Sequence, residues 1–324
     1  MPMHPVTASF FAALTGCATR YAGLPELQPA EFQTPLPVQH VTVDGVDVAY
    51  MDSGEHGQAD VPVVMLHGLS SSMGFWAHNL PELARDRRVL AIDLPGYGAS
   101  GRPDAPYTPP WYADTVIGFL DAVGIGRAVV VGHSMGGQVA LTVALDHPDR
   151  VDRLVLAAPA GIETFPPGAA AWMKQHWHEG RALEASEDAL RLTFETLVFN
   201  RMDAHAERLL EERVRTRDTA AFRGTSVAVS RSVAGMLDHP VFPRLGEVRA
   251  PTLIVYGTDD RMIPNPVFTG GRTLRIAEQG RDAIPGAELV MLPGAGHTVM
   301  HDDPAGFNRA VITFLDRTGP GAVR

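Results

Sequence analysis

Cysteine, lysine and positive charge are scarce in this sequence, and each scarcity excludes a class of protein. Among 324 residues the chain has a single cysteine, Cys17, so neither an internal disulfide framework nor a cysteine-based zinc cluster can form. Acidic residues outnumber basic ones by 37 to 27, for a formal net charge of −10, and only Lys174 is a lysine. No basic run is present, so no nucleic-acid partner is predicted.

A long apolar run is missing as well. The uncharged stretch Val6–Gly16 is too short to span a bilayer, but its length suits the h-region of a signal peptide. It ends in Leu14-Thr15-Gly16-Cys17, which resembles the lipobox of bacterial lipoproteins, although the first five residues contain no Lys or Arg. Two interpretations stay open. Either Cys17 carries a lipid anchor and the protein lies in the bacterial cell envelope, or Cys17 is an incidental thiol and the protein is cytoplasmic. Residues 1–36 are expected to form an N-terminal arm that ends in a Pro-rich linker.

The rest of the sequence alternates short apolar runs with helical segments. The turn Asp44-Gly45 joins two β-prone runs, as expected of a hairpin. The predicted strands are 40–43, 46–50, 62–66, 89–92, 128–131, 154–157, 252–256 and 288–292. Runs of Val, Ile and Leu without polar alternation are typical of strands that are buried on both faces. Ala113–Val123 and Met135–His147 place apolar residues at helical spacing. The predicted fold class is therefore α/β, with a mostly parallel, doubly wound sheet.

The strand–helix alternation stops between Gly161 and His239. This stretch contains four helical segments and no clear strand: 169–179, 186–199, 203–217 and 222–237. We therefore expect a helical cap over residues 161–240, inserted into a core made of residues 37–160 and 241–324.

The motif Gly132-His133-Ser134-Met135-Gly136 carries the clearest chemical signal. It matches G-x-S-x-G, the nucleophile elbow, and it has the required context of a strand before it and a helix after it. The serine of such an elbow occupies a strained turn that exposes its hydroxyl, and the flanking glycines let the strand and helix pack closely. Ser134 is the predicted nucleophile.

A second loop is expected to complete an oxyanion hole. His67-Gly68-Leu69 follows a predicted strand, and a glycine there lets the loop approach the nucleophile. The predicted donors are the backbone amides of Leu69 and Met135, whereas His67 is expected to be structural. No G-x-G-x-x-G opens a helix after the first strand, so neither NAD nor FAD, and no other cofactor, is predicted.

Together these motifs make the chain similar to the α/β-hydrolases, of the serine esterase or lipase type with a helical cap, from about His40 to the end. The family's order is serine, acid, histidine. The resemblance implies that the acid lies three residues after Gly257 and four before Pro264, a position that Asp260 fits and Asp259 does not. It also implies that His297, in the glycine-rich loop after the last strand, is the base.

Ser134, His297 and Asp260 with two amide donors predict acyl transfer through a covalent acyl-enzyme. A small-molecule ester with an apolar acyl or alcohol group is the expected substrate. Three alternatives stay open: a carbon–carbon bond hydrolase, a cofactor-free haloperoxidase or perhydrolase, and a non-catalytic ligand-binding protein of this fold. Candidate pocket residues are Phe75, Trp76 and His133. The cap would act as a lid and offers further apolar side chains: Trp172, Met173, Trp177, Phe194, Phe199, Met202 and Phe222.

The histidines outside this motif set do not predict a metal site. His176 and His178 are two residues apart, and such residues do not share a helix face. His301 precedes two aspartates but has no evident partners, and it is expected at the surface. No metal is predicted.

Overall fold

An eight-stranded sheet organises the computed structural model, which describes residues 20–54 and 61–318 of the chain. The strand order is β1-β2-β4-β3-β5-β6-β7-β8. Only β1 and β2 run antiparallel to their neighbours, and the other pairings are parallel. The strands are β1 (Val38–Val43), β2 (Val46–Asp52), β3 (Val63–Leu66), β4 (Val89–Ile92), β5 (Ala128–His133), β6 (Val151–Ala157), β7 (Thr252–Gly257) and β8 (Glu288–Leu292). All eight predicted strands are present, and the predicted fold class is confirmed.

Both faces of the sheet are covered by helices, which explains the unbroken apolar strands. In β3, Val64 and Leu66 belong to one buried cluster, whereas Val63 and Met65 belong to another on the opposite face. The first cluster includes side chains from α2 (Pro109–Ala122), α3 (Met135–Asp146) and α8 (Thr273–Ala283). The second includes side chains from α1 (Leu80–Leu83), α9 (Val299–Asp302) and α10 (Pro304–Thr318). Helices therefore pack against both faces of the sheet.

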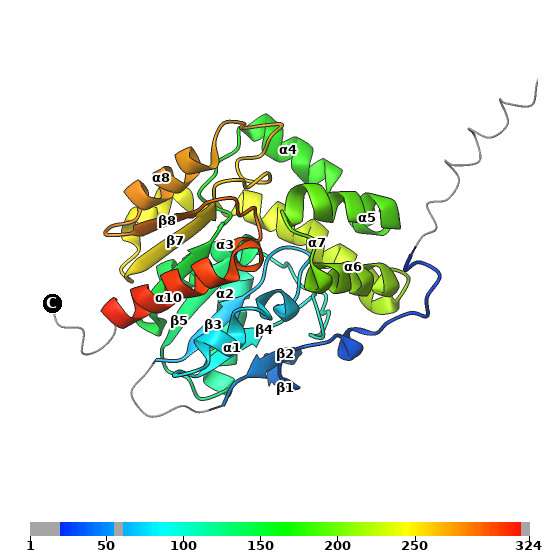
Figure 1. Ribbon diagram of the computed structural model, residues 1–324, viewed down its shortest axis with the longest axis horizontal. Helices are drawn as coiled ribbons and strands as arrows, with labels where there is room; N and C mark the ends of the chain where they lie inside the picture. The colour runs from blue at the N-terminus through cyan, green and yellow to red at the C-terminus, as the bar shows by residue number, and fades with distance from the viewer. Residues whose placement is uncertain (1–19, 55–60, 319–324) are drawn as a thin grey trace, which may run out of the picture.

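A helical insertion separates β6 from β7. It consists of α4 (Pro167–His176), α5 (Glu187–Thr193), the π-helical turn η5 (Phe194–Val198), α6 (Ala204–Thr216) and α7 (Ala220–Asp238). Figure 1 shows these helices gathered beyond one end of the strands rather than against either face of the sheet. Two of these helices begin at typical N-cap residues. The side chains of Asp203 and Thr219 accept hydrogen bonds from first-turn amides of α6 and α7.

Residues 20–36 lie along this insertion. The carboxylate of Glu187 accepts hydrogen bonds from the amides of Arg20, Tyr21 and Ala22. The Tyr21 ring is buried against Leu190, Leu210 and Val214, and Figure 1 shows the segment passing below α6 towards β1. The docked part of the arm is therefore an additional wall of the insertion. Cys17 lies outside the described residues, and within the described ones no helix is both long and apolar enough to cross a membrane.

Candidate active site

The turn between β5 and α3 places Ser134 in an unusual backbone conformation. Its φ is 52° and its ψ is −117°, a region that costs a non-glycine residue about 1–3 kcal/mol. The glycines on either side are sterically required. A Cβ on Gly132 would lie 2.2 Å from the Gly136 carbonyl oxygen, and one on Gly136 would lie 2.5 Å from the carbonyl oxygens of Leu66 and His67. The local sequence therefore forces the strand and helix together and turns the serine outward.

Three predicted residues from three separate loops meet at this turn. With its proton on Nδ1, the His297 ring donates a hydrogen bond to Asp260 Oδ2 over 3.0 Å. Its Nε2 lies 3.0 Å from Ser134 Oγ and accepts from that hydroxyl. Asp260 follows β7 and His297 follows β8, so the parallel strands deliver all three side chains to one edge of the sheet.

Asp260 rather than Asp259 is the carboxylate that contacts His297. Its Oδ1 accepts hydrogen bonds from the amides of Met262 (2.8 Å) and Ile263 (2.9 Å), which leaves Oδ2 for the imidazole. The Asp260 side chain is fully buried, whereas Asp259 is exposed and accepts from Thr258. The backbone amides thus hold the carboxylate in a fixed orientation towards the ring.

The two predicted oxyanion donors lie beside Ser134. Met135 is the first residue of α3, so its amide is one of the N-terminal amides that have no acceptor within the helix. Leu69 follows Gly68, and a Cβ added to Gly68 would lie 3.2 Å from Ser134 Cβ and 2.9 Å from His133 Nδ1. The loop after β3 therefore passes directly against the serine.

Buried hydrogen bonds fix the shape of that loop. Asp93 accepts from the amides of Met73 (2.6 Å) and Ala99 (2.7 Å), and burial raises the pKa of Asp93 to about 6. The ring of His67 accepts from the Leu94 amide and donates to the Gly68 carbonyl. Burial lowers the pKa of His67 to about 4, so the ring is neutral, as a structural link between two loops requires.

His133 lies beneath the site. It is buried, and its Nε2 donates to the backbone carbonyl of His297 over 3.1 Å. Burial, and next the neighbouring His297, hold the pKa of His133 well below its usual value. A neutral ring here adds no positive charge close to His297. His133 thus orients the loop that carries His297.

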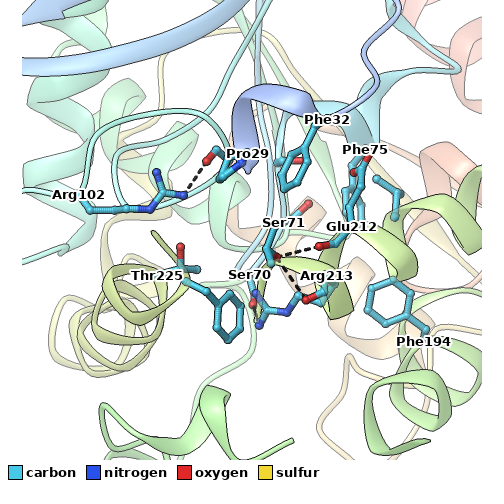
Figure 2. Close-up of a pocket in the computed structure, with 15 residues that line it drawn as sticks. Pro29, Phe32, Ser70, Ser71, Phe75, Arg102, Phe194, Glu212, Arg213 and Thr225 are labelled. Atoms are coloured by element: carbon cyan, nitrogen blue, oxygen red, sulfur yellow. Dashed lines mark hydrogen bonds between the residues drawn. The ribbon is translucent and has the colours of Figure 1, made fainter. Parts of the chain in front are cut away.

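A cavity opens beside the loop after β3, between the arm and the insertion (Figure 2). Its apolar lining includes Phe32, Phe75, Phe194, Leu209 and Phe222, and its polar lining includes Ser70, Ser71, Ser72, Arg102, Glu212 and Arg213. Of the three predicted pocket residues, Phe75 lines this cavity, whereas His133 is buried beneath the site and does not line it. Trp76, contrary to expectation, is fully buried and packs on Phe307, because the η2 turn (Met73–Trp76) points it into the core under α10.

Only some of the predicted lid side chains face the cavity. Phe194 and Phe222 line it, whereas Phe199 is 1% exposed and stacks on Phe75 with ring centroids 5.6 Å apart. The others are not among the residues that line it: Met173 is buried, Trp177 and Met202 are partly buried, and Trp172 is exposed. Apolar spacing identified the helices but could not tell cavity-facing residues from packing ones.

Arg213 in the cavity wall had no signal in the sequence. It donates to Ser70 Oγ over 2.6 Å, and its guanidinium lies 4.2 Å from the centroid of the Phe222 ring. Burial lowers the pKa of Arg213 to about 10. Arg213 is partly buried, and in the described ranges no carboxylate forms an ion pair with it.

The expectation that His301 lies at the surface is wrong. The His301 side chain is 1% exposed, because α9 turns it inward towards His78 and His205. These three histidines lie in three distant segments of the chain, so neither motif nor spacing could group them. Their proximity reopens the expectation that the protein has no metal site.

Comparison with known proteins agrees with this geometry. Residues 63–310 match the model of the alpha/beta hydrolase family. The chain is 30% identical to 2-hydroxymuconate semialdehyde hydrolase from Pseudomonas sp. (strain CF600), over 88% of this chain and 96% of that protein. The chain therefore belongs to the α/β-hydrolase family.

Solved structures extend the similarity to the whole described fold. A hydrolase from Pseudomonas aeruginosa PA01 superposes with a TM-score of 0.69 at 28% identity, covering 86% of this chain and 98% of that one. An N-acyl homoserine lactone degrading enzyme superposes with a TM-score of 0.65, also at 28% identity, over 85% of this chain and 100% of that one. Two of these three relatives are named as hydrolases and the third as a lactone-degrading enzyme.

Proposed function

We propose that this protein is a serine hydrolase that cleaves carboxylic esters through an acyl-enzyme. The observation that carries the proposal is the continuous hydrogen-bonded chain from Asp260 through His297 to Ser134, at a strained turn beside two amide donors. A serine at this turn can form a covalent ester with an acyl group. The lactone-degrading relative supports the choice of bond, because a lactone is a cyclic ester.

The proposed reaction has two halves. Ser134 Oγ attacks the ester carbonyl while His297 Nε2 takes the hydroxyl proton, and the resulting oxyanion accepts hydrogen bonds from the Leu69 and Met135 amides. The C–O bond then breaks, and His297 returns the proton to the departing alcohol. In the second half a water molecule gives a proton to His297 and attacks the acyl carbon. Ser134 leaves with that proton, and the carboxylic acid is released.

Asp260 stabilises the imidazolium that forms in each half. Because it accepts from Nδ1, it also keeps Nε2 free to act as the base. The neutral His133 beneath the ring would not oppose that positive charge. We place an apolar acyl or alcohol group near Phe75, Phe194 and Phe222, in the cavity that begins one residue beyond Leu69.

The direct test uses p-nitrophenyl esters of increasing acyl length with the full chain. Wild-type protein is expected to hydrolyse them and to be labelled by a fluorophosphonate. Ser134→Ala should lose at least about 10⁴-fold in kcat and all labelling, without a lower melting temperature. Ser230→Ala, a helical serine on α7, is the matched control and should keep both properties. No turnover and no labelling of the wild type would overturn the proposal.

A carbon–carbon bond hydrolase is the second candidate, and Arg213 favours it. The name of one relative, 2-hydroxy-6-oxo-6-(2'-aminophenyl)hexa-2,4-dienoic acid hydrolase, indicates a substrate with a carboxylate. A partly buried guanidinium without an ion-pair partner among the described residues suits that group. The 30% sequence identity to the semialdehyde hydrolase also supports the carbon–carbon bond hydrolase as a candidate. On this candidate, Arg213→Gln should raise KM for a 2-hydroxy-6-oxo-dienoate at least about tenfold and leave neutral esters unaffected, whereas Arg223→Gln on exposed α7 should change neither. Equal effects on both substrates would exclude a carboxylate-binding role.

A further inference from the structure

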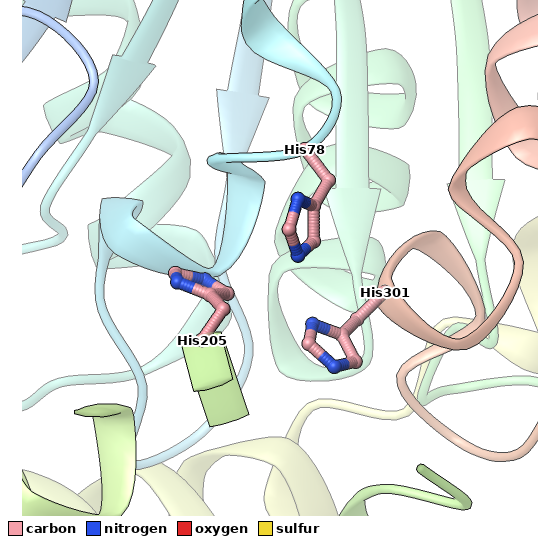
Figure 3. A group of neighbouring side chains, drawn as sticks. All are labelled: His78, His205 and His301. Carbon is pink, nitrogen blue, oxygen red and sulfur yellow. The ribbon is translucent and has the colours of Figure 1, made fainter. Parts of the chain in front are cut away.

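Three histidine side chains converge at the junction of the core and the helical insertion (Figure 3). His78 lies in the loop that follows β3 and η2, His205 in the first turn of α6, and His301 on α9. One ring nitrogen of each lies within 4.8 Å of the corresponding nitrogens of the other two. The ring centroids are 4.8, 5.1 and 5.6 Å apart.

Several of these nitrogens have no hydrogen-bond partner among the residues that the structure describes. Both nitrogens of His301 are buried without one, and so is Nε2 of His78. His301 is 1% exposed, so its ring is shielded from bulk solvent. A buried polar atom without a partner costs roughly 1–3 kcal/mol, and proteins rarely retain several at one place without a reason. The unpaired nitrogens of His78 and His301 mark the group as a binding site for something that the described chain itself does not supply.

A carboxylate completes the group. Asp203 Oδ2 lies 3.8 Å from His78 Nε2, and Asp203 Oδ1 lies 3.4 Å from His301 Nε2, at an angle that makes no hydrogen bond. Asp203 caps α6 through Oδ1, which accepts from the amides of His205 and Ala206. The cap holds the carboxylate through Oδ1, while Oδ2 accepts a 3.4 Å hydrogen bond from exposed Arg201 and lies beside His78.

His205 already has the arrangement of a metal-bound histidine. Its Nε2 donates to the Gly74 carbonyl over 3.1 Å, which fixes the tautomer and leaves the lone pair on Nδ1. A guanidinium N–H of Arg208 now donates to that lone pair. Arg208 is only half-buried and also bonds to Gln33, so it can turn outward when a cation takes its place.

We propose that His78, His205, His301 and Asp203 form a binding site for a divalent transition metal, with Zn²⁺ as the best match. Three imidazoles and one carboxylate suit Zn²⁺ in tetrahedral geometry, and imidazole-rich sites disfavour Mg²⁺ and Ca²⁺. Zn–N bonds of about 2.0–2.1 Å imply nitrogens about 3.3 Å apart, so the rings must close by somewhat more than 1 Å. Side-chain rotations provide that movement.

The location gives the site a structural consequence. A bound ion would join the loop after β3, the start of α6 and the helix that follows His297. Phe199 packs its ring edge-on against His301, with centroids 4.6 Å apart, and stacks on Phe75 in the cavity wall. Metal binding would therefore tie the insertion to the core beside the proposed active site, and it would stabilise the folded chain by mass action.

The test titrates chelator-treated full-length protein with CoCl₂ and ZnCl₂. Wild-type protein should bind one Co²⁺ with the intense visible absorption of a tetrahedral site, and Zn²⁺ should displace it and raise the melting temperature. His78→Gln is the main variant, because His78 is the least buried ligand and its substitution should fold; it should bind Co²⁺ at least tenfold more weakly.

Two comparisons keep the experiment decisive. His178→Gln removes an exposed histidine outside the cluster and should bind Co²⁺ like the wild type. Asp203→Asn retains an oxygen that can cap α6 and should weaken binding while the metal-free melting temperature changes little. Absence of the visible band, or equal Co²⁺ affinity in wild type and His78→Gln, would overturn the proposal.

Discussion

His297 and His301 are four residues apart, equally buried, and opposite in their hydrogen bonding. The His297 ring has a carboxylate on Nδ1 and a serine hydroxyl on Nε2, so its tautomer and orientation are fixed. Among the described residues, neither nitrogen of the His301 ring has a hydrogen-bond partner, although Asp203 Oδ1 lies 3.4 Å from Nε2. The difference teaches that burial alone does not define a role. A ring that must pass a proton is held by permanent partners, whereas a ring without partners is suited to a ligand from outside.

The largest expected effect is the loss of kcat when His297, the first residue of this comparison, is replaced. His297→Gln removes the ring nitrogen that accepts the proton of Ser134 Oγ, so kcat on p-nitrophenyl esters should fall at least about 10⁴-fold with little change in the unfolding transition. Steady-state kinetics and a urea titration check the two parts. His178→Gln is the control and should retain wild-type kcat. Activity above a tenth of wild type in His297→Gln would mean that another base serves Ser134.

A second expected effect, a loss of about 10⁴-fold in kcat, distinguishes Asp260 from the neighbouring Asp259. Asp260→Asn keeps the side-chain volume but cannot stabilise the imidazolium, and its amide favours the wrong His297 tautomer. Asp259→Asn changes an exposed residue and should alter kcat less than threefold. Parallel pH–rate profiles of both variants provide the measurement. A loss confined to Asp259→Asn would reverse the assignment of the acid.

The smallest effect concerns a buried carboxylate that lacks such partners. Burial raises the pKa of Glu212 on α6 to about 7. The carboxylate accepts a hydrogen bond from the Gln33 amide, which opposes this rise. Because the folded-state pKa is above the unfolded one, its stabilising contribution is complete below about pH 4.5 and is lost as the pH rises through about 7. Relative to Glu212→Gln, the wild type should lose up to about 3 kcal/mol of unfolding free energy between pH 5 and pH 8.

Urea denaturation at both pH values measures that difference. Glu211→Gln, a change at the half-exposed neighbouring residue, is the control and should follow the wild type across the range. If wild type and Glu212→Gln respond equally to pH, the Glu212 carboxylate is solvated in the folded state and the contrast with Asp260 disappears.

Local patterns were enough to predict the fold and the core of the candidate site. Strands buried on both faces need continuous apolar sequence, so β3, β5 and β7 could be recognised from a few residues each. The turn at Ser134 needs small residues at fixed positions, and Gly132 and Gly136 meet that need within five residues. Asp260 and His297 could be found because parallel strands end at one edge and the family order fixes where to look.

Features that depend on the approach of distant segments could not be predicted in this way. Whether Phe75 lines a cavity and Trp76 lies in the core depends on how one turn meets α10. The contacts of Arg213 depend on α7, which supplies Phe222, and on the loop after β3, which supplies Ser70. The arm was expected to be a linker, yet its described part docks through Glu187, a residue with no local signal.

The sequence by itself thus determined the α/β core and the Ser134 elbow, because strand burial and a strained turn impose rules on adjacent residues. Only the tertiary structure decided that His301 is buried beside His78 and His205. Those three positions are separated by more than 90 residues each, and nothing in their local sequence distinguishes them from solvated histidines. The physical reason is that the apolar packing of α6 and α9 against the core sets their distances, and no local rule encodes that packing.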